Sequence, residues 1–349
     1  MKTSISIGSA YYDGEGWDGL VEFVEAADRL GVDSAWSAEA WGMDSVASLG
    51  YLAGCTSRIR LGTGIMQVSS RTPAMTAMTA LSLAKLSGDR FCLGLGLSGP
   101  QVVEGLHGAA FERPLGRLRE YVAIVRMALS GEKLEFEGEH FQLPRRGGEG
   151  KALRLSMTPK PELPIYLATL GEKSLELTGE VADGWLGTSF IPERADAMLE
   201  PIRRGAARAN RSLSDIEIHV GGNLEISEDV EGLLDKYRQG MAFTLGAMGS
   251  AKTNFYNAAY ARAGFEDAAK EVQALWVSGK KKEAVAAVPD EMLLAANMIG
   301  TEEMVRARLR AFRDAGVDVL RLSAPGRSTK DRIAQLEQNL DLIATECEQ

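Results

Sequence analysis

Cysteine and histidine are both scarce in this sequence of 349 residues, which has three of each. Cys55, Cys92 and Cys347 are far apart and form no C-x-x-C pair, so neither a disulfide framework nor a zinc ribbon is predicted. No two histidines are three or four residues apart, and no H-E-x-x-H pattern occurs, so no metal site is predicted. The chemistry is therefore expected to come from acids, bases or an organic cofactor.

Long apolar segments and an excess of basic residues are also missing. No run of 18 apolar residues occurs, and the first residues lack the apolar core of a signal peptide. Lys and Arg total 39 against 48 Asp and Glu, a net charge of −9, so binding to nucleic acid or to an anionic membrane is not expected. We expect a cytoplasmic protein whose partner is a small molecule.

What the sequence does contain is a regular alternation of short strands and helices. A glycine-rich turn at residues 13–16 is followed by apolar residues at helical spacing from Leu20 to Leu30. Eight such units predict a parallel (β/α)8 TIM barrel, with an open Rossmann-type sheet as the alternative. The expected strands are Ser4–Ile7, Val32–Trp36, Ile59–Ile65, Phe91–Leu97, Pro164–Ala168, Trp185–Gly187, Ile216–Leu224 and Val317–Leu322.

Two segments interrupt this spacing. Residues 131–163 are rich in Gly, Pro and charge and predict an excursion without a long helix. Residues 225–300, between the seventh and eighth strands, are mostly helical in pattern. We expect one domain over residues 1–349, with both insertions on the C-terminal, catalytic face of the barrel.

A glycine-rich segment ends the fourth expected strand. Gly94, Gly96, Ser98 and Gly99 would let the backbone lie against a phosphate or a planar ring. The spacing is not the G-x-G-x-x-G of dinucleotide sites, and we expect no helix directly after it. These glycines could instead serve close packing at the barrel rim.

The end of the fifth expected strand predicts an anion site. The chain runs from Ala168 through Leu170 to a turn at Gly171, where a helix begins and presents free N–H groups. A plain helix N-cap is the alternative. The hydroxyl of Thr188, at the end of the next strand, could reach the same phosphate.

Other strand ends carry polar side chains that a barrel would bring to one face, which suits a ring-shaped ligand. Trp41 could instead belong to the core, Asp44 could cap the helix from Ser45 to Gly54, and Arg71 could pair with a surface carboxylate. The set comprises Glu39, Trp41, Asp44, Gln67, Ser69, Arg71, Glu104 and His107.

Several motifs in order resemble one family. The sequence is similar over nearly its whole length to the F420-dependent members of the luciferase-like monooxygenase superfamily, relatives of methylenetetrahydromethanopterin reductase. The matching segments are Arg58–Ile65, Arg71–Ala74, Leu86–Phe91, Ser98–Gly108, Arg119–Val122, Asn254–Tyr256 and Ala287–Glu291.

The resemblance implies a TIM barrel, usually a homodimer, that holds the deazaflavin F420 at the C-terminal ends of its strands. F420 carries hydride only. Relatives have a nonprolyl cis peptide bond after the third strand, against the deazaflavin ring, and the matching bond is Gly64–Ile65. Gln67, Gly96, Ser98 and Ala168 are the neighbouring cofactor-binding candidates.

The resemblance also implies roles for individual residues. The cofactor phosphate corresponds to Leu170, Gly171 and Thr188, in agreement with the anion site above. Glu104 corresponds to the acid near the ring carbon that exchanges hydride, and it would need burial to hold a proton near neutrality. Glu39 and Trp41 remain candidate acid or positioning groups.

The resemblance has one difference that bears on the reaction. Several F420-dependent dehydrogenases of this group have a histidine near the ring where this sequence has Ala40. We therefore favour reduction of C=C, C=N or C=O, with a carboxylic acid or water as proton source, over histidine-based alcohol oxidation. The alternatives are an FMN-dependent monooxygenase that uses O2 and a partner reductase, and a noncatalytic cofactor-binding barrel.

Overall fold

The computed structural model describes residues 1–8, 16–249 and 253–347, so most of the predicted turn at residues 13–16 lies outside the described part. Over that part, the main sheet has nine strands in the order β3-β2-β1-β13-β10-β9-β8-β5-β4, and β3 also pairs with β5. Because β3 pairs with β5, the order closes into an eight-stranded parallel barrel. The short strand β4 follows β3 in the chain and pairs with a later part of β5. The predicted (β/α)8 barrel is confirmed, and the open Rossmann-type sheet is wrong.

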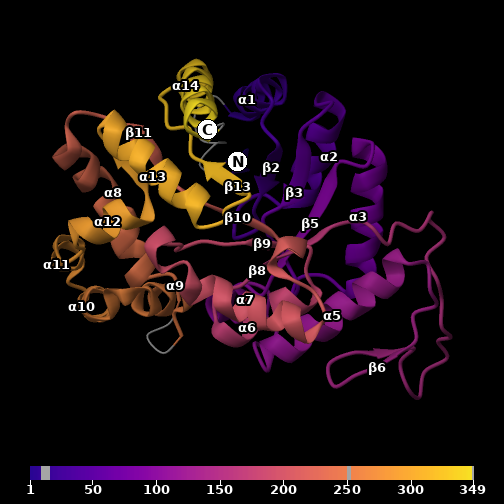
Figure 1. Ribbon diagram of the computed structural model, residues 1–349. Coiled ribbons are helices and arrows are strands. Elements are labelled where there is room, and N and C mark those ends of the chain that lie inside the picture. The colour runs from indigo at the N-terminus through magenta and orange to yellow at the C-terminus, as the bar shows by residue number, and fades with distance from the viewer. Residues whose placement is uncertain (9–15, 250–252, 348–349) are drawn as a thin grey trace. The chain divides into compact units, whose positions relative to one another are not determined.

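The chain divides into two compact units. Figure 1 labels helices and strands of both. The N-terminal unit comprises residues 6–168 and 181–184. Its elements are α1 (Gly16–Leu30), β2 (Ser34–Ser37), α2 (Ser45–Cys55), β3 (Arg60–Thr63), β4 (Met66–Gln67), α3 (Pro73–Ser87), β5 (Phe91–Gly96), α4 (Pro100–Gly105), α5 (Pro114–Leu129), β6 (Phe136–Glu137), β7 (Gln142–Leu143) and β8 (Ile165–Ala168).

The C-terminal unit comprises residues 1–5, 169–180 and 185–349. Its strands, two of which begin or end in the other unit, are β1 (Lys2–Ile7), β9 (Gly184–Leu186), β10 (Glu217–Gly222), β11 (Leu224–Ile226), β12 (Met298–Gly300) and β13 (Val319–Leu322). Its helices are α6 (Glu172–Val181), α7 (Asp196–Arg208), α8 (Val230–Gly246), α9 (Phe255–Tyr260), α10 (Glu266–Val277), α11 (Lys281–Ala286), α12 (Asp290–Ala296), α13 (Glu302–Asp314) and α14 (Thr329–Cys347), with short turns at Pro192–Arg194, Leu213–Asp215 and Ala261–Phe265.

A buried tryptophan organises the strands of the N-terminal unit. The ring of Trp36 packs edge-on against Tyr166, with 4.9 Å between the ring centroids. A Cβ atom on Gly62 would lie 2.4 Å from the Trp36 ring, so only glycine fits at that point of β3. Gly62 on β3 therefore allows the Trp36 ring to pack directly against the strand backbone.

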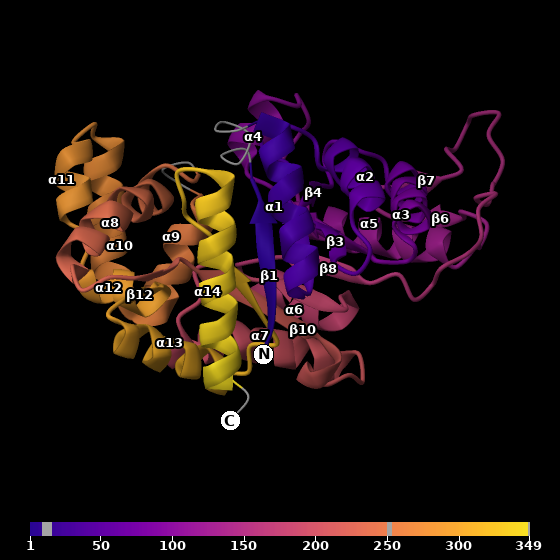
Figure 2. The same ribbon diagram turned by 90° about the horizontal axis from the view of Figure 1, so that it is seen from above.

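The segment 131–163 has no helix, as predicted, but it contains a small hairpin that the sequence did not reveal. Strands β6 and β7 pair antiparallel in an extended loop next to α5 (Figure 2). The carboxylate of Glu120 on α5 accepts hydrogen bonds from the backbone N–H groups of Glu139, His140 and Phe141, at 2.8, 2.9 and 3.0 Å. One helix side chain therefore fixes the hairpin turn, because an ionised carboxylate is a strong acceptor.

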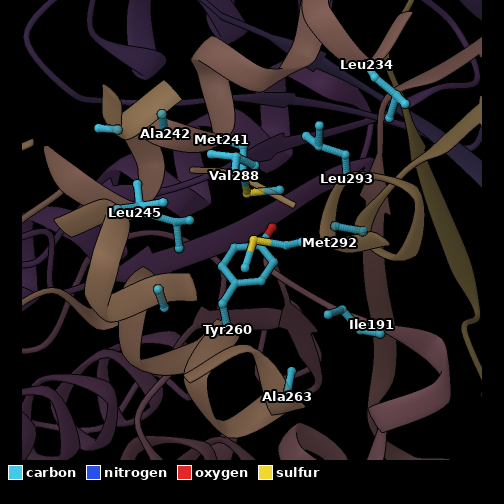
Figure 3. Close-up of a cluster of buried hydrophobic side chains, with 14 of the residues drawn as sticks. Ile191, Leu234, Met241, Ala242, Leu245, Tyr260, Ala263, Val288, Met292 and Leu293 are labelled. Carbon is cyan, nitrogen blue, oxygen red and sulfur yellow. The ribbon is translucent and has the colours of Figure 1, made fainter. Parts of the chain in front are cut away.

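The segment 225–300 is mostly helical and lies between β10 and β13, as predicted. Its helices enclose a separate apolar cluster to which Met241, Leu245, Tyr260, Met292 and Leu293 contribute (Figure 3). All five side chains are at most 8% exposed, so the insertion has a core of its own. The short parallel pair β11 and β12 joins the insertion's two ends and was not predicted.

No helix in the described part of the chain is long and apolar enough to cross a membrane.

Candidate functional site

The Gly64–Ile65 peptide bond, at the end of β3, is cis, as the resemblance implied. Neighbouring backbone groups hold both residues. The Gly64 N–H donates to the carbonyl of Ser37 at 2.7 Å, and the Ile65 carbonyl accepts from the N–H of Glu39 at 3.1 Å. The Ile65 side chain is only half-buried, so an apolar, branched group stands at the carboxyl end of the strand.

Close contacts leave Ile65 little freedom in the N-terminal unit. A Cβ atom on Gly96 would lie 2.8 Å from Cγ1 of Ile65, and a Cβ atom on Gly64 would lie 3.0 Å from Cβ of Trp36. Both distances are shorter than carbon atoms tolerate without displacement. Gly96 at the end of β5 therefore makes room for the Ile65 side chain, in line with the close-packing interpretation of this glycine.

Glu39 is engaged on both carboxylate oxygens. Oε1 accepts from the N–H and hydroxyl of Ser45 at 3.3 and 3.0 Å, whereas Oε2 accepts from the Gln67 N–H at 3.2 Å and from Arg71 Nη1 at 2.7 Å. The Glu39 side chain is 9% exposed and that of Arg71 is 21% exposed. The Glu39 carboxylate therefore forms an ion pair with Arg71 and links the segments that follow β2 and β4 by hydrogen bonds. Arg71 pairs with this partly buried acid and not with a surface carboxylate.

Gln67, next to this ion pair, has one unsatisfied atom. Its side-chain nitrogen donates to the carbonyls of Glu39 and Ala40 at 3.2 and 3.4 Å. Its Oε1 atom is buried, and no hydrogen-bond partner for it exists among the residues that the structure describes. Because a buried acceptor without a donor is costly, Gln67 offers an acceptor for an N–H group of a ligand.

The segment after β5 differs from the sequence expectation in one respect. A helix does open directly after the glycine-rich segment, since α4 begins at Pro100 with proline in its first turn, and Ser98 before it has a left-handed φ of 58°. Glu104 lies on α4 and is exposed, and its Oε1 accepts from the Phe111 N–H at 3.3 Å. Protein alone therefore does not supply the burial that an acid role for Glu104 would need.

Trp41 and Asp44 follow β2. Trp41 is 69% exposed, so the alternative that it belongs to the core is wrong. Asp44 caps α2 by accepting from the N–H groups of Val46 and Ala47 at 2.8 and 2.9 Å, which confirms the capping interpretation. An exposed indole beside a fixed helix end is available for contact with a ligand.

The predicted anion site belongs to the C-terminal unit, except for Ala168, the last residue of β8. Helix α6 begins at Glu172, as expected, and the Gly171 carbonyl accepts from the Leu175 N–H at 2.8 Å. The Leu170 carbonyl accepts a hydrogen bond from the guanidinium of Arg262. The first-turn N–H groups of a helix have no partner within it, and the guanidinium of Arg262 places a cation nearby, so the start of α6 favours an anionic ligand.

The end of β9 places Thr188 in the same unit. The Gly187 N–H donates to the His219 carbonyl at 2.8 Å, and the Gly187 carbonyl accepts from Arg321 Nη2 at 3.3 Å. Thr188 itself is half-buried. Sequence reasoning missed Arg321, although a lone arginine inside the apolar strand Val319–Leu322 was a visible signal.

No group of three or more His, Cys, Asp or Glu residues within residues 1–8, 16–249 and 253–347 is arranged to hold a metal ion.

Comparison with known proteins places the chain in a family. The pattern of the luciferase-like monooxygenases, a family of oxidoreductases, matches residues 1–319, and the chain belongs to this family. It is 38% identical over 332 residues to the "Putative coenzyme F420-dependent oxidoreductase Rv3520c" of Mycobacterium tuberculosis, covering 93% of this chain and 95% of the relative.

More distant relatives agree. The chain is 28% identical over 320 residues to the 5,10-methylenetetrahydromethanopterin reductase of Methanolobus tindarius, covering 91% of this chain and 93% of that protein. Its fold matches the coenzyme F420-dependent tetrahydromethanopterin reductase of Methanopyrus kandleri with a TM-score of 0.78, 22% identity and 97% coverage of both chains. This last likeness concerns the fold alone and agrees with the barrel described above.

Proposed function

We propose that this chain is a coenzyme F420-dependent oxidoreductase that transfers hydride between C5 of the deazaflavin and a small organic molecule, in the direction of C=C, C=N or C=O reduction. The observation that carries the proposal is the end of β3, where the half-buried, apolar side chain of Ile65 packs against the backbone of Gly96. Membership of the luciferase-like monooxygenase family and the similarity to a putative coenzyme F420-dependent oxidoreductase support it.

The residues of the N-terminal unit fit a planar heterocycle. Ile65 offers an apolar surface for a ring face, and the unpartnered Oε1 of Gln67 offers an acceptor for a ring N–H. Backbone at Gly64, Gly96 and Ser98 would border the ring, together with Ala168. When bound, the deazaflavin supplies the hydride, and the protein supplies orientation and a dry surface.

The residues of the C-terminal unit fit the cofactor's phosphate. The backbone N–H groups at Leu170 and Gly171 and the hydroxyl of Thr188 would bind it, at the start of a ten-residue helix. This assignment is separate from that of the ring and can fail independently of it.

Glu104, Glu39 and Trp41 take different roles in this proposal. Glu104 would donate the proton to the substrate, and among the described residues its exposed carboxylate accepts one hydrogen bond, from the Phe111 N–H. Glu39 is a positioning residue, since its carboxylate is already occupied by Arg71 and Ser45. Trp41 would cover the organic molecule with its exposed indole.

The deciding experiment is a parallel titration of the purified protein with F420 and with FMN, followed by tryptophan fluorescence. Micromolar or tighter F420 binding with negligible FMN binding is expected, followed by oxidation of reduced F420 with reducible substrates. Preference for FMN with oxygen consumption would overturn the proposal in favour of a two-component monooxygenase. Binding of F420 without turnover across a broad panel would favour a noncatalytic barrel.

Assembly into a homodimer is a further part of the proposal. Three apolar side chains on α3, Met75, Met78 and Leu86, are 51%, 43% and 63% exposed and follow a helical stripe. An exposed apolar stripe on one helix favours burial against a second copy. Sedimentation at micromolar concentration should give twice the 37.6 kDa mass of the chain, and Met78→Glu should shift it to the monomer.

A further inference from the structure

Arg321 stands out among the described residues of the C-terminal unit as a cation without an acidic partner. It lies on β13, and its only hydrogen bond within the described part of the chain runs from Nη2 to the Gly187 carbonyl, at 3.3 Å. No carboxylate of that part of the chain lies within ion-pair distance of it. Charged groups that are half-buried are normally paired, so an unpaired guanidinium indicates a group that meets its counter-charge elsewhere.

The sheet register shows which way Arg321 faces. In the parallel pairing, Arg321 is level with Ser4 on β1 and with Gly221 on β10, and β10 and β13 run side by side (Figure 1). Side chains that are level or two residues apart share a face. Ser4 contacts the ring of His219 at 2.5 Å, on the face opposite the apolar residues Leu320 and Leu322. Arg321 therefore shares the polar inner face of the barrel strands.

Tyr256, near the start of α9, adds a second polar group. Burial raises the pKa of Tyr256, and Arg321 opposes that rise by its positive charge, so the two groups interact electrostatically. Burial lowers the pKa of Arg321, and Tyr256 opposes that fall. The phenol is therefore an O–H donor at neutral pH, and it is half-buried, as is the Arg321 guanidinium.

We propose that Arg321 and Tyr256 bind a carboxylate group of the organic substrate. One guanidinium carries one positive charge, which a carboxylate balances, and its remaining N–H groups match the two carboxylate oxygens. The position agrees with this role, because barrel enzymes take their substrate-binding residues from the strand ends. The inference rests on the proposed function and names its substrate class, an organic acid with a reducible double bond.

Binding of matched probes tests the site without the cofactor. Isothermal titration with benzoate and with methyl benzoate should show at least tenfold tighter binding of the acid by the unaltered protein. In Arg321→Met this preference should disappear, in Arg321→Lys it should be intermediate, and in Tyr256→Phe it should fall by roughly threefold. No preference in the unaltered protein, or a preference that survives Arg321→Met, would overturn the proposal.

Two controls separate this effect from folding and from general anion attraction. Circular dichroism and melting temperature should confirm that Arg321→Met is folded. Arg310→Met removes an arginine from the exposed side of α13, where it pairs with Glu346, and should keep the preference for benzoate. A loss of the preference in Arg310→Met would assign the effect to overall charge and overturn the site.

Turnover links the site to the reaction. Reduced F420 should reduce 3-oxocyclohex-1-ene-1-carboxylate more efficiently than its methyl ester, and Arg321→Met should lower that ratio of kcat/KM by about 100-fold. Reduction of both compounds without preference overturns the carboxylate site and leaves the proposed function standing. If the protein prefers benzoate in an Arg321-dependent way but does not bind F420, the proposed function fails and the carboxylate site stands. Weaker F420 binding by Arg321→Met would assign the site to a carboxylate of the cofactor and overturn its assignment to the substrate.

Discussion

Arg71 in the N-terminal unit and Arg321 in the C-terminal unit are both half-buried arginines near strand ends, but only one is electrically compensated. Arg71 donates to Glu39 at 2.7 Å, and the other Glu39 oxygen is held by Ser45. Arg321 contacts only the neutral Gly187 carbonyl, at 3.3 Å, among the residues that the structure describes. The difference separates a charge that maintains the structure from a charge that is available to a ligand.

This contrast assigns different work to the two units. At the strand ends of the N-terminal unit, the charges of Arg71 and Glu39 neutralise each other. This unit offers a ligand the apolar surface of Ile65 and one hydrogen-bond acceptor, Oε1 of Gln67. The C-terminal unit offers a ligand the guanidinium of Arg321 and the backbone N–H donors at the start of α6.

The largest effect is expected from breaking the compensated pair. Glu39→Ala leaves Arg71 half-buried without a counter-charge and should lower the free energy of unfolding by about 3 kcal/mol. Urea unfolding measures this value, and the double variant Glu39→Ala with Arg71→Met should recover part of it. A loss below about 1 kcal/mol would show that the pair is as weak as a surface ion pair.

The contact between Gly96 and Ile65 in the N-terminal unit can be tested by substitution of Gly96. The added Cβ of Gly96→Ala would meet Ile65 Cγ1 at 2.8 Å and should cost about 1 to 3 kcal/mol of stability, together with a weaker affinity for F420. Gly54→Ala on α2 is the matched control, because a Cβ atom added there would meet no described atom within 4 Å. Equal F420 affinity in both variants would remove Ile65 from the ring site.

Asp28 is a second carboxylate with several hydrogen-bond donors around it, and its effect on stability is expected to depend on pH. Burial raises its pKa, but hydrogen bonds from the backbone N–H groups of Ser57, Ile59 and Arg58 outweigh this and hold it below its ordinary value. Its stabilisation is therefore fully present above the unfolded-state pKa and is lost as the pH falls through the lower folded-state pKa. Asp28→Asn should cost about 1.5 to 3 kcal/mol at pH 7 and flatten the acid limb of stability against pH. An unchanged acid limb would contradict this account.

Replacement of Arg321, which has no acidic partner among the described residues, should increase stability where the substitutions above decrease it. Arg321→Met removes a charge without a counter-charge and should raise the free energy of unfolding by about 0.5 to 2 kcal/mol, as is common when functional groups are replaced. Thermal unfolding in buffer without carboxylates checks it. A clear loss of stability would mean that Arg321 serves the fold through Gly187, as Arg71 serves it through Glu39.

The smallest structural effect is expected at Glu104. Because this side chain is exposed, Glu104→Gln should change stability by less than about 0.5 kcal/mol. Turnover with reduced F420 should fall while the F420 affinity stays nearly constant, since the proton source is lost and the binding groups remain. Unchanged turnover would remove Glu104 from the mechanism.

Local patterns in the sequence were sufficient for most of the fold. Alternation and helical spacing located all eight barrel strands to within about two residues at most of their ends, and Asp44 followed by an apolar helix predicted the α2 cap. The short helix α4 was missed, although Pro100 at its first turn was a usable signal. The strands β6, β7, β11 and β12 were missed because segments of two or three residues carry no measurable period.

For the candidate site, the sequence by itself determined which residues stand at strand ends, because strand boundaries and turn residues are local properties. The motifs around Gly64 and Ile65 also indicated the cis bond that the structure contains. Only the tertiary structure decided which charges are compensated. The partners of Glu39 are 6, 28 and 32 positions away, and the register that turns Arg321 toward the inner face joins strands more than 300 positions apart. Compensation depends on distance in space, which chain closure sets and sequence spacing does not.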